Sequence, residues 1–277
     1  MDTDTSRFNL IRDILYKHTG IKLDDKKDIM IANRLEKLKR VLHYNGNIDT
    51  ILEEVSNGNY LEEFINTFTT NKTHFFRECF HFEDLKNRVL PPLFNIGREI
   101  SIYCSASSTG EEPYSIAISV LAAKEEHNAK NTRVRILATD IDTNVLTTAR
   151  EGIYRFNTHK HDFPEWAQPS KYFKRRVQDS NSNEFLIKAK DELKALITFK
   201  QMNLMSPSYP MKPNSFDVIF CRNVLIYFSP QDQNKILKKL FNLLRPGGTL
   251  YLGHSENPLD LSSMVERLGS NIFTKKG

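Results

Sequence analysis

A run of small residues follows the strand-like segment at 99–104 and precedes a helix-like segment. It reads SASSTGEEP at 105–113, and its small side chains and single glycine let backbone amides approach a ligand closely. Glu111 and Glu112 stand where the helix begins, and their charge would repel a phosphate. The run also lacks the glycine patterns of dinucleotide-binding and P-loop sequences. A ligand with hydroxyls and positive charge fits better, and S-adenosylmethionine, with its sulfonium, amino group and ribose, is such a ligand.

Two aspartates end the next strand-like segment, in the sequence ATDID at 138–142. An acidic side chain at this place can accept hydrogen bonds from both hydroxyls of a ribose, as it does in dinucleotide-binding folds. We predict that Asp140 has this role and that Asp142 caps the helix that starts at Thr143. In the alternative interpretation, Asp140 or Asp142 serves only as a cap of that helix.

The placement of these residues depends on an alternation of strand-like and helix-like segments. The strand-like segments are 99–104, 133–138, 216–221 and 249–253, and the helix-like segments are 112–127, 143–151 and 230–244. This alternation predicts a parallel sheet with helices on both faces, in which ligands bind at the carboxyl ends of the strands. The polar stretch 154–200, which ends in β-like runs at 185–188 and 196–200, breaks the alternation and is predicted to be a small antiparallel insertion.

The first eighty residues differ, because their apolar residues recur at helical spacing. Helices are expected near 8–18, 26–43, 48–56 and 60–69. We therefore predict an all-α N-terminal domain at 1–80, a linker at 81–92, and an α/β domain at 93–277 that carries the insertion at about 154–200. A chain of 277 residues with 39% hydrophobic composition is long enough for two such domains.

Four motifs, in this order, resemble those of the CheR-type chemotaxis receptor methyltransferases. They are NKTHFFR at 71–77, TGEEPYS at 109–115, ATDID at 138–142 and FCRNVLIYF at 220–228. The resemblance implies a class I, Rossmann-like methyltransferase domain and protein-glutamate O-methyltransferase activity in sensory adaptation, with S-adenosylhomocysteine as the product of the cofactor. It also implies a set of cofactor contacts, namely Asn71, Thr73, Arg77, Glu111, Asp140, Asn203, Leu204, Arg222 and Asn223.

Most of these assignments have a plainer alternative. The alternatives are capping of a helix at Phe75 for Asn71 and Thr73, a surface ion pair for Arg77, a charge at a helix N-terminus for Glu111, and an ordinary loop position for Asn203. Phe75, Phe76 and Phe228 are expected to lie in the core rather than on the cofactor.

Methyl transfer to a glutamate is an in-line displacement by a carboxylate, which is already ionised at neutral pH because its reference pKa is about 4.3. No general base is then needed, and the sequence offers no Ser-His-Asp order, reactive-cysteine context, disulfide framework or metal-ligand pattern. We predict a site that works by proximity and orientation. Arg222 or Arg77 would position the carboxylates, and Tyr227 would line the methyl channel or donate to the substrate carboxylate. Plain packing is the alternative for Tyr227.

The resemblance implies that the partner is the cytoplasmic helical domain of membrane chemotaxis receptors, whose methylation sites lie on acidic helical bundles. Arg34, Lys37 and Arg40 would give the helix at 26–43 a basic face for this partner, although such a face is also typical of a solvated helix. Some relatives dock a receptor C-terminal peptide through a glycine-containing turn in the insertion. The corresponding segment, 176–184, has no glycine, so this tether is not expected.

Composition excludes some classes of protein and leaves two other functions open. The net charge of +5 favours an acidic partner without choosing one. No apolar run approaches the roughly 18 residues that span a bilayer, and the polar N-terminus lacks a secretory signal, so a cytoplasmic protein without membrane insertion is expected.

The alternatives are a methyltransferase for nucleic acid or a small molecule, and a non-catalytic cofactor-binding signalling module. Nucleic acid is not expected, because FCRNVLIYF lacks the Pro-Pro-Tyr/Phe pattern of amino-group methylases.

Overall fold

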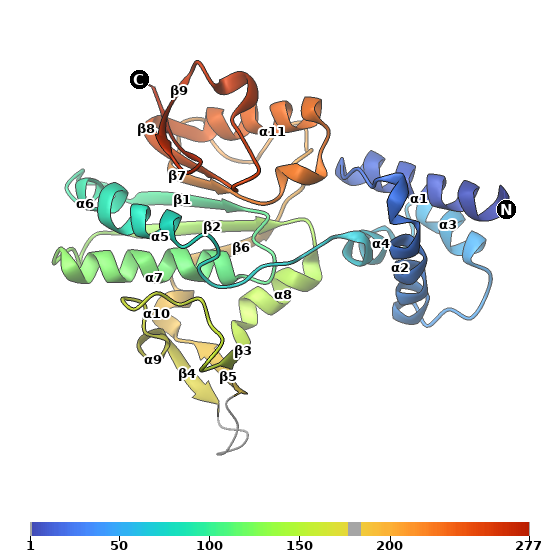
Figure 1. Cartoon of the computed structure of the whole chain (residues 1–277), viewed down its shortest axis with the longest axis horizontal. Coiled ribbons are helices and arrows are strands. Elements are labelled where there is room, and N and C mark those ends of the chain that lie inside the picture. Colours follow the sequence, from blue (N-terminus) through green and yellow to red (C-terminus); the bar gives the residue numbers. More distant parts are fainter. Residues whose placement is uncertain (1, 177–183, 277) are drawn as a thin grey trace.

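The computed structural model describes residues 2–176 and 184–276, which form three parts (Figure 1). Helices make up the N-terminal part, a seven-stranded sheet with flanking helices forms the centre, and a three-stranded sheet projects from it. The predicted fold class, an all-α start followed by an α/β domain with a small antiparallel insertion, is confirmed. Over the described ranges, no helix combines the length and the apolar character needed to cross a membrane.

The N-terminal helices are α1 (Asp2–Thr19), α2 (Asp28–Val41), α3 (Ile48–Ser56) and α4 (Leu61–Phe68). Each turns an apolar stripe inward, and Leu15 of α1, Ile31 and Leu38 of α2 and Phe64 of α4 are completely buried. The helical spacing of the apolar residues thus gives these helices a core of their own, beside the two cores of the central sheet.

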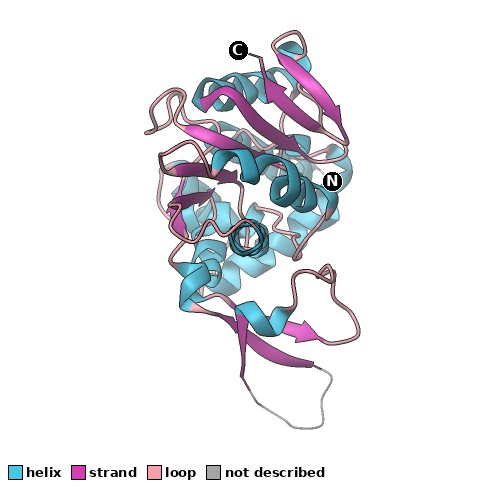
Figure 2. Ribbon diagram, turned by 90° about the vertical axis from the view of Figure 1, so that its left-hand side faces the viewer, coloured by secondary structure: helices cyan, strands magenta, loops and turns pink. Residues whose placement is uncertain are grey.

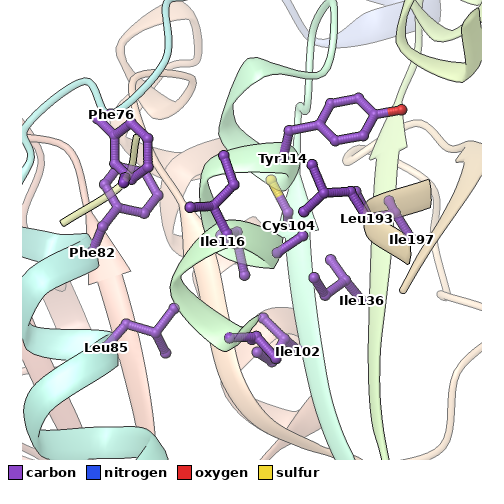
Figure 3. Close-up of a cluster of buried hydrophobic side chains, with 14 of the residues drawn as sticks. Phe76, Phe82, Leu85, Ile102, Cys104, Tyr114, Ile116, Ile136, Leu193 and Ile197 are labelled. Carbon is purple, nitrogen blue, oxygen red and sulfur yellow. The ribbon is translucent and has the colours of Figure 1, made fainter. Parts of the chain in front are cut away.

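A strap, residues 69–79, leads from α4 to the central part without forming a helix or strand. It is followed by α5 (Phe80–Asp84), a π-helical turn (Leu85–Val89) and α6 (Leu90–Leu93). The range that we expected to be a linker, 81–92, is therefore helical. Its Phe82 and Leu85 are completely buried in the core that also contains Ile102 of the sheet (Figure 3).

The central sheet has the strand order β6-β2-β1-β7-β8-β10-β9. Its strands are β1 (Ile100–Ser105), β2 (Val134–Asp140), β6 (Ile197–Gln201), β7 (Phe216–Cys221), β8 (Leu244–Leu252), β9 (Val265–Gly269) and β10 (Ile272–Lys275). The strands from β6 to β8 pair in parallel, and β10 is antiparallel to both of its neighbours. Because β2, β1 and β7 are neighbours in the sheet and run parallel, their carboxyl ends lie next to one another.

Successive residues of the central strands point to opposite faces of the sheet. Ile102 and Cys104 of β1 pack on the side of α7 (Glu111–Glu126), whereas Tyr103 packs on the side of α11 (Pro230–Leu243). All six residues of β1 and of β7 are buried, as expected for strands covered by helices on both faces. α8 (Thr143–Glu151) follows β2 and starts at the predicted residue.

The small sheet consists of β3 (Ile153–Asn157), β5 (Glu184–Ala189) and β4 (Phe173–Arg176), in that spatial order and antiparallel. Two short helices, α9 (Pro169–Tyr172) and α10 (Asp191–Lys194), flank its last two strands in the sequence. Both views show it projecting from the body of the molecule (Figures 1 and 2). Of the glycine-free segment 176–184, residues 177–183 lie outside the described residues.

One element of the predicted insertion was placed wrongly. The β-like run 196–200 was expected in the antiparallel insertion, but it forms β6, which pairs in parallel with β2 at the edge of the central sheet. Ile197 packs there in the core of the central sheet. A run of β-forming residues indicates a strand without naming its partner, and here the partner lies some sixty residues earlier, as in the pair Ile136 and Ile197.

Gly110, the residue before α7, has a φ of 101°, and a Cβ there would lie 2.8 Å from both the Ala149 Cβ and the Tyr154 hydroxyl. We expect Gly110→Ala to lower the free energy of unfolding by about 2–4 kcal/mol, because it combines backbone strain with overpacking. Gly247 is a matched control, since its φ is 74° and no atom lies within 4 Å of an added Cβ. Gly247→Ala should cost only about 1 kcal/mol. Urea unfolding of both variants measures the difference, and equal losses would contradict it.

Candidate functional site

A pocket of about 980 Å³, counted with its open mouth, lies where β1, β2 and β7 end. This is the edge at which ligands bind in parallel α/β sheets. The strap lines one part of the pocket, and Thr19, Ile21 and Leu23 contribute to its wall from the N-terminal part. All the predicted cofactor contacts except Glu111 line this pocket, as does Tyr227.

Asp140 ends β2 and is 6% exposed. Its carboxylate accepts hydrogen bonds from the backbone N–H groups of Ser108, at 2.8 Å, and of Asp142, at 3.0 Å. Burial raises the pKa of Asp140 to about 6, although these N–H groups act in the opposite direction. A carboxylate has about four acceptor positions, so Asp140 retains the capacity to accept hydrogen bonds from a ligand in the pocket.

Asp142 has the predicted capping role. One of its oxygens accepts from the N–H groups of Asn144 and Val145 at the start of α8. Its other oxygen accepts from the side chains of Thr69, at 2.6 Å, and Asn71, at 2.7 Å. The same aspartate thus begins α8 and holds the strap against the end of β2.

The strap carries Asn71, Thr73 and Arg77 into the pocket wall. The alternative in which Asn71 and Thr73 cap a helix at Phe75 is wrong, because residues 75–79 form turns and α5 starts only at Phe80. Phe75 and Phe76 belong to the core as expected. Phe76 is completely buried, and its N–H donates to the Ser115 hydroxyl.

Arg222 follows β7, and its side chain has no exposed surface. Its Nη1 donates to a Glu112 oxygen at 2.7 Å, and its Nη2 lies 3.3 Å from a Glu78 oxygen and donates to the Arg77 carbonyl. Burial tends to raise the pKa of Glu78, but Arg222 and hydrogen bonds from Asn223 and His254 outweigh it and hold the pKa at about 2. For Glu112, burial outweighs Arg222, and the pKa is raised.

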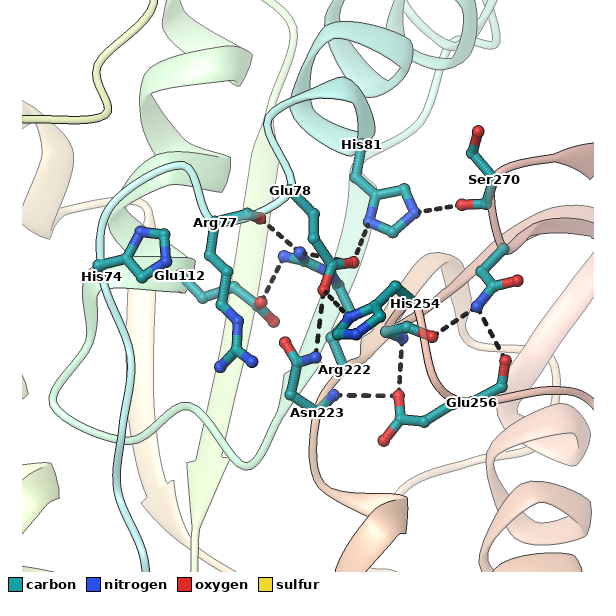
Figure 4. Close-up of polar contacts among 12 residues, drawn as sticks. His74, Arg77, Glu78, His81, Glu112, Arg222, Asn223, His254, Glu256 and Ser270 are labelled. Carbon is teal, nitrogen blue, oxygen red and sulfur yellow. Dashed lines mark hydrogen bonds and ion pairs between the residues drawn. The ribbon is translucent and has the colours of Figure 1, made fainter.

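Figure 4 shows how this ion network occupies Arg222. Both terminal nitrogens of Arg222 already have protein partners, and its Nε, which has none, is buried. The guanidinium of Arg77 points away from the network, and its hydrogen bond to the Lys72 carbonyl is 3.2 Å long. Of the two arginines, Arg77 is therefore the better placed to meet a carboxylate of a ligand in the pocket.

Asn203 and Tyr227 connect the pocket with the N-terminal part. The Asn203 side-chain N–H donates to the His18 carbonyl at 2.7 Å, and its oxygen accepts from Met205 N–H. The Tyr227 carbonyl accepts from Lys22 N–H at 2.9 Å. Asn203 is therefore a structural bridge as well as a lining residue.

The two glutamates that begin α7 have different surroundings. Glu111 accepts a hydrogen bond from the Thr109 hydroxyl at 2.6 Å and does not line the pocket, and burial raises its pKa. Glu112 lines the pocket and pairs with Arg222. Sequence reasoning selected Glu111 and missed both Glu112 and Glu78. Glu78 directly follows Arg77, the last residue of the NKTHFFR motif, and this position was the only sequence feature that could have indicated that Glu78 belongs to the site.

The three predicted basic residues of α2 do not form one uniform surface. Arg34 donates to the Phe68 carbonyl and to the Thr70 hydroxyl, at 2.9 Å for the latter, and burial lowers its pKa. Arg34 thus links α2 to the start of the strap. Lys37 and Arg40 are exposed. No group of metal-ligating side chains is found among the described residues.

The pocket side chains fit S-adenosylmethionine. Asp140 supplies a buried carboxylate, and Glu112 a partly buried one, for a ligand with hydroxyls and positive charge. Ile141, Leu204 and Phe228 supply apolar surface for a planar base. Phe228, which was expected in the core, is buried and also lines the pocket.

Both the N-terminal and the central part of the chain match known proteins. Residues 71–273 match the model of the SAM-binding domain of CheR methyltransferases, and residues 6–69 match the model of their all-alpha domain. The chain is 36% identical to the chemotaxis protein methyltransferase of Escherichia coli strain K12 over 270 residues, which cover 97% of this chain and 90% of that protein. It is 37% identical to the chemotaxis protein methyltransferase of Borreliella burgdorferi, over 92% of this chain and 93% of that protein. S-adenosylmethionine is thus the cofactor that these matches and the pocket indicate.

Protonation of Asp140 should compete with cofactor binding, because only the ionised carboxylate can accept from two hydroxyls. With its pKa at about 6, the dissociation constant of S-adenosylhomocysteine should be constant above pH 7 or so and should rise towards tenfold per pH unit below about pH 6. In the Asp140→Asn variant, the dissociation constant of S-adenosylhomocysteine should be about 10–100-fold higher and independent of pH.

Titration calorimetry across this pH range measures the effect. Asp260→Asn, which changes an exposed carboxylate, is the control and should follow the unmodified protein. A pH-independent affinity of the unmodified protein would contradict the role of Asp140.

Proposed function

Because the chain belongs to the CheR methyltransferase family, we propose that it transfers the methyl group of S-adenosylmethionine to glutamate side chains of chemotaxis receptors and forms glutamate methyl esters. The observation that carries this proposal is the pocket at the ends of β1, β2 and β7, where the carboxylates of Asp140 and Glu112 can meet the cofactor and Arg222 joins the surrounding segments. A glutamate substrate is ionised at neutral pH and needs no base to act as nucleophile.

The cofactor supplies, when bound, a methyl group that is activated by its sulfonium. In our proposal, Asp140 accepts the ribose hydroxyls, and Asn203 and Leu204 form the adenine side of the pocket. Arg77 binds the carboxylate of the methionine portion, in a charge-assisted hydrogen bond. Asn71, Thr73 and Asn223 complete the wall, and Glu111 shapes the start of α7 through Thr109.

Arg222 and Tyr227 act at the reacting end in this proposal. Arg222 holds the strap, α7 and the end of β7 together, and so orients the groups that face the methyl carbon. Tyr227 lines the pocket two residues after Leu225, in a short 3₁₀ turn, and it would confine the methyl channel or donate to the incoming carboxylate. Such orientation is a sufficient source of catalysis for this reaction, since effective molarities of well-oriented groups are large.

The methyl ester itself provides the test. The purified protein, labelled S-adenosylmethionine and receptor-containing membranes should yield label that alkali releases as methanol, because esters hydrolyse in base and methyl amines do not. Asp140→Ala should abolish the release, since it removes the ribose acceptor. Base-stable label would show a methyltransferase with another substrate class, such as nucleic acid or a small molecule. Cofactor binding without any transfer would favour a non-catalytic signalling module.

The exposed residues of α2 provide the proposed contact with the acidic receptor helices. Lys37→Glu combined with Arg40→Glu should reduce kcat/KM for receptor methylation about tenfold or more at low salt, because it reverses two charges on the docking surface. The affinity for S-adenosylhomocysteine should not change. Arg34 is left intact, since it holds the strap.

A matched control, Lys130→Glu with Arg133→Glu, reverses the charges of two exposed basic residues that precede β2, at the end away from Asp140. This control should leave methylation unchanged. An equal loss in both double variants would mean that net charge, rather than the α2 surface, governs receptor docking.

A further inference from the structure

Glu256 is a buried carboxylate that no part of the site so far has used. It follows β8 in the sequence, is 6% exposed, and does not line the pocket. One of its oxygens accepts from Val224 N–H at 2.8 Å and Leu225 N–H at 2.7 Å. The other accepts from Asn223 N–H at 3.0 Å and Gly253 N–H at 2.6 Å. A single side chain therefore satisfies four backbone donors.

Three of these donors are consecutive and belong to the turn after β7, residues 222–228. Asn223 has a φ of 56°, which is uncommon for a residue other than glycine. Successive N–H groups that converge in this way form an anion-binding concavity. Glu256 fills it with an internal carboxylate, and without that carboxylate three partly buried donors would lack a partner.

Asn271 and Gly253 pack closely around Glu256 and restrict its position. Asn271, which is buried beside β10, donates to the carbonyls of Gly253, at 2.5 Å, and of Glu256, at 2.8 Å. A Cβ on Gly253 would lie 2.8 Å from the backbone nitrogen of Asn223 and 2.9 Å from a carboxylate oxygen of Glu256. The Glu256 carboxylate thus joins the turn after β7 to Gly253 after β8, and Asn271, just before β10, holds the Glu256 backbone (Figure 4).

The turn that Glu256 holds forms one wall of the pocket, through Arg222, Asn223, Val224, Tyr227 and Phe228. We infer that Glu256 is a positioning residue for methyl transfer: its carboxylate fixes the turn 222–228, and the turn fixes the reacting end of the pocket. The kinetic part of this inference rests on the proposed function. The ribose acceptor Asp140 and the adenine-side residues Asn203 and Leu204 come from other segments, and the turn adds only Phe228 on the adenine side. We therefore expect the turn to govern orientation more than cofactor affinity.

Glu256→Gln keeps the length of the side chain but turns an NH₂ group towards two backbone donors. We expect kcat for receptor methylation to fall about 10–100-fold, because a displacement of about 1 Å at the reacting groups is enough for such a loss. The dissociation constant of S-adenosylhomocysteine should change less than about threefold. Amide hydrogen exchange should become faster in 222–228 and should stay unchanged in the rest of the sheet.

Glu266→Gln, on the exposed side of β9, is the matched control and should behave as the unmodified protein in all three measurements. Gly253→Ala provides a second perturbation of the same turn, because its Cβ would press on Asn223 and Glu256. It should give the same separation of kcat from cofactor affinity, and its agreement with Glu256→Gln would exclude an effect of charge loss alone.

Unchanged kcat and unchanged exchange in Glu256→Gln would overturn the inference. A parallel loss of kcat, cofactor affinity and thermal stability would also overturn it, since that pattern indicates a scaffold role only. If the unmodified protein does not methylate receptors, the proposed function fails on its own, and the exchange measurement still decides the positioning role. Faster exchange confined to 222–228 then supports it, and unchanged exchange contradicts it.

Discussion

A buried arginine with a carboxylate on either side holds the pocket together. Arg222 comes from the end of β7, Glu112 from the first turn of α7 and Glu78 from the strap, so one guanidinium joins three segments that are far apart in the sequence. Truncation of one partner of such a pair leaves an uncompensated buried charge, at a cost of about 3–5 kcal/mol. These contacts keep the Glu78 end of the strap on the sheet, and Asp142 holds its beginning. The ion network therefore both assembles the cofactor site and, through Arg222 and Glu112, forms part of its lining.

The other carboxylates around the pocket have structural tasks of the same kind. Asp142 joins the strap to α8, and Glu256 holds the turn after β7. Asp140 differs, because its hydrogen-bond partners are backbone N–H groups and its side chain faces the pocket. This division suits a reaction in which the nucleophile arrives ionised. The protein then has to orient two molecules and does not have to move a proton.

Local sequence patterns correctly predicted those features of the fold that depend on residues close together in the sequence. The capping role of Asp142, the start of α8 at Thr143 and the alternation of strands and helices all follow from short-range patterns, and the structure confirms them. The partner of β6, the ion pair between Arg222 and Glu78, and the four N–H groups on Glu256 join distant segments. Neither composition nor periodicity encodes such contacts. Arg34 illustrates the same limit, because its charge suggested a docking surface and only its neighbours reveal that it holds the strap.

The most direct test of the account is a crystal structure of the protein with bound S-adenosylhomocysteine. We predict that both ribose hydroxyls lie within hydrogen-bond distance of the Asp140 carboxylate and that a guanidinium nitrogen of Arg77 contacts the ligand carboxylate. Arg222 should remain paired with Glu78 and Glu112. A ligand that leaves Asp140 without contact, or that draws Arg222 away from its two glutamates onto the ligand carboxylate, would contradict the view that the ion network assembles the site and other residues bind the cofactor.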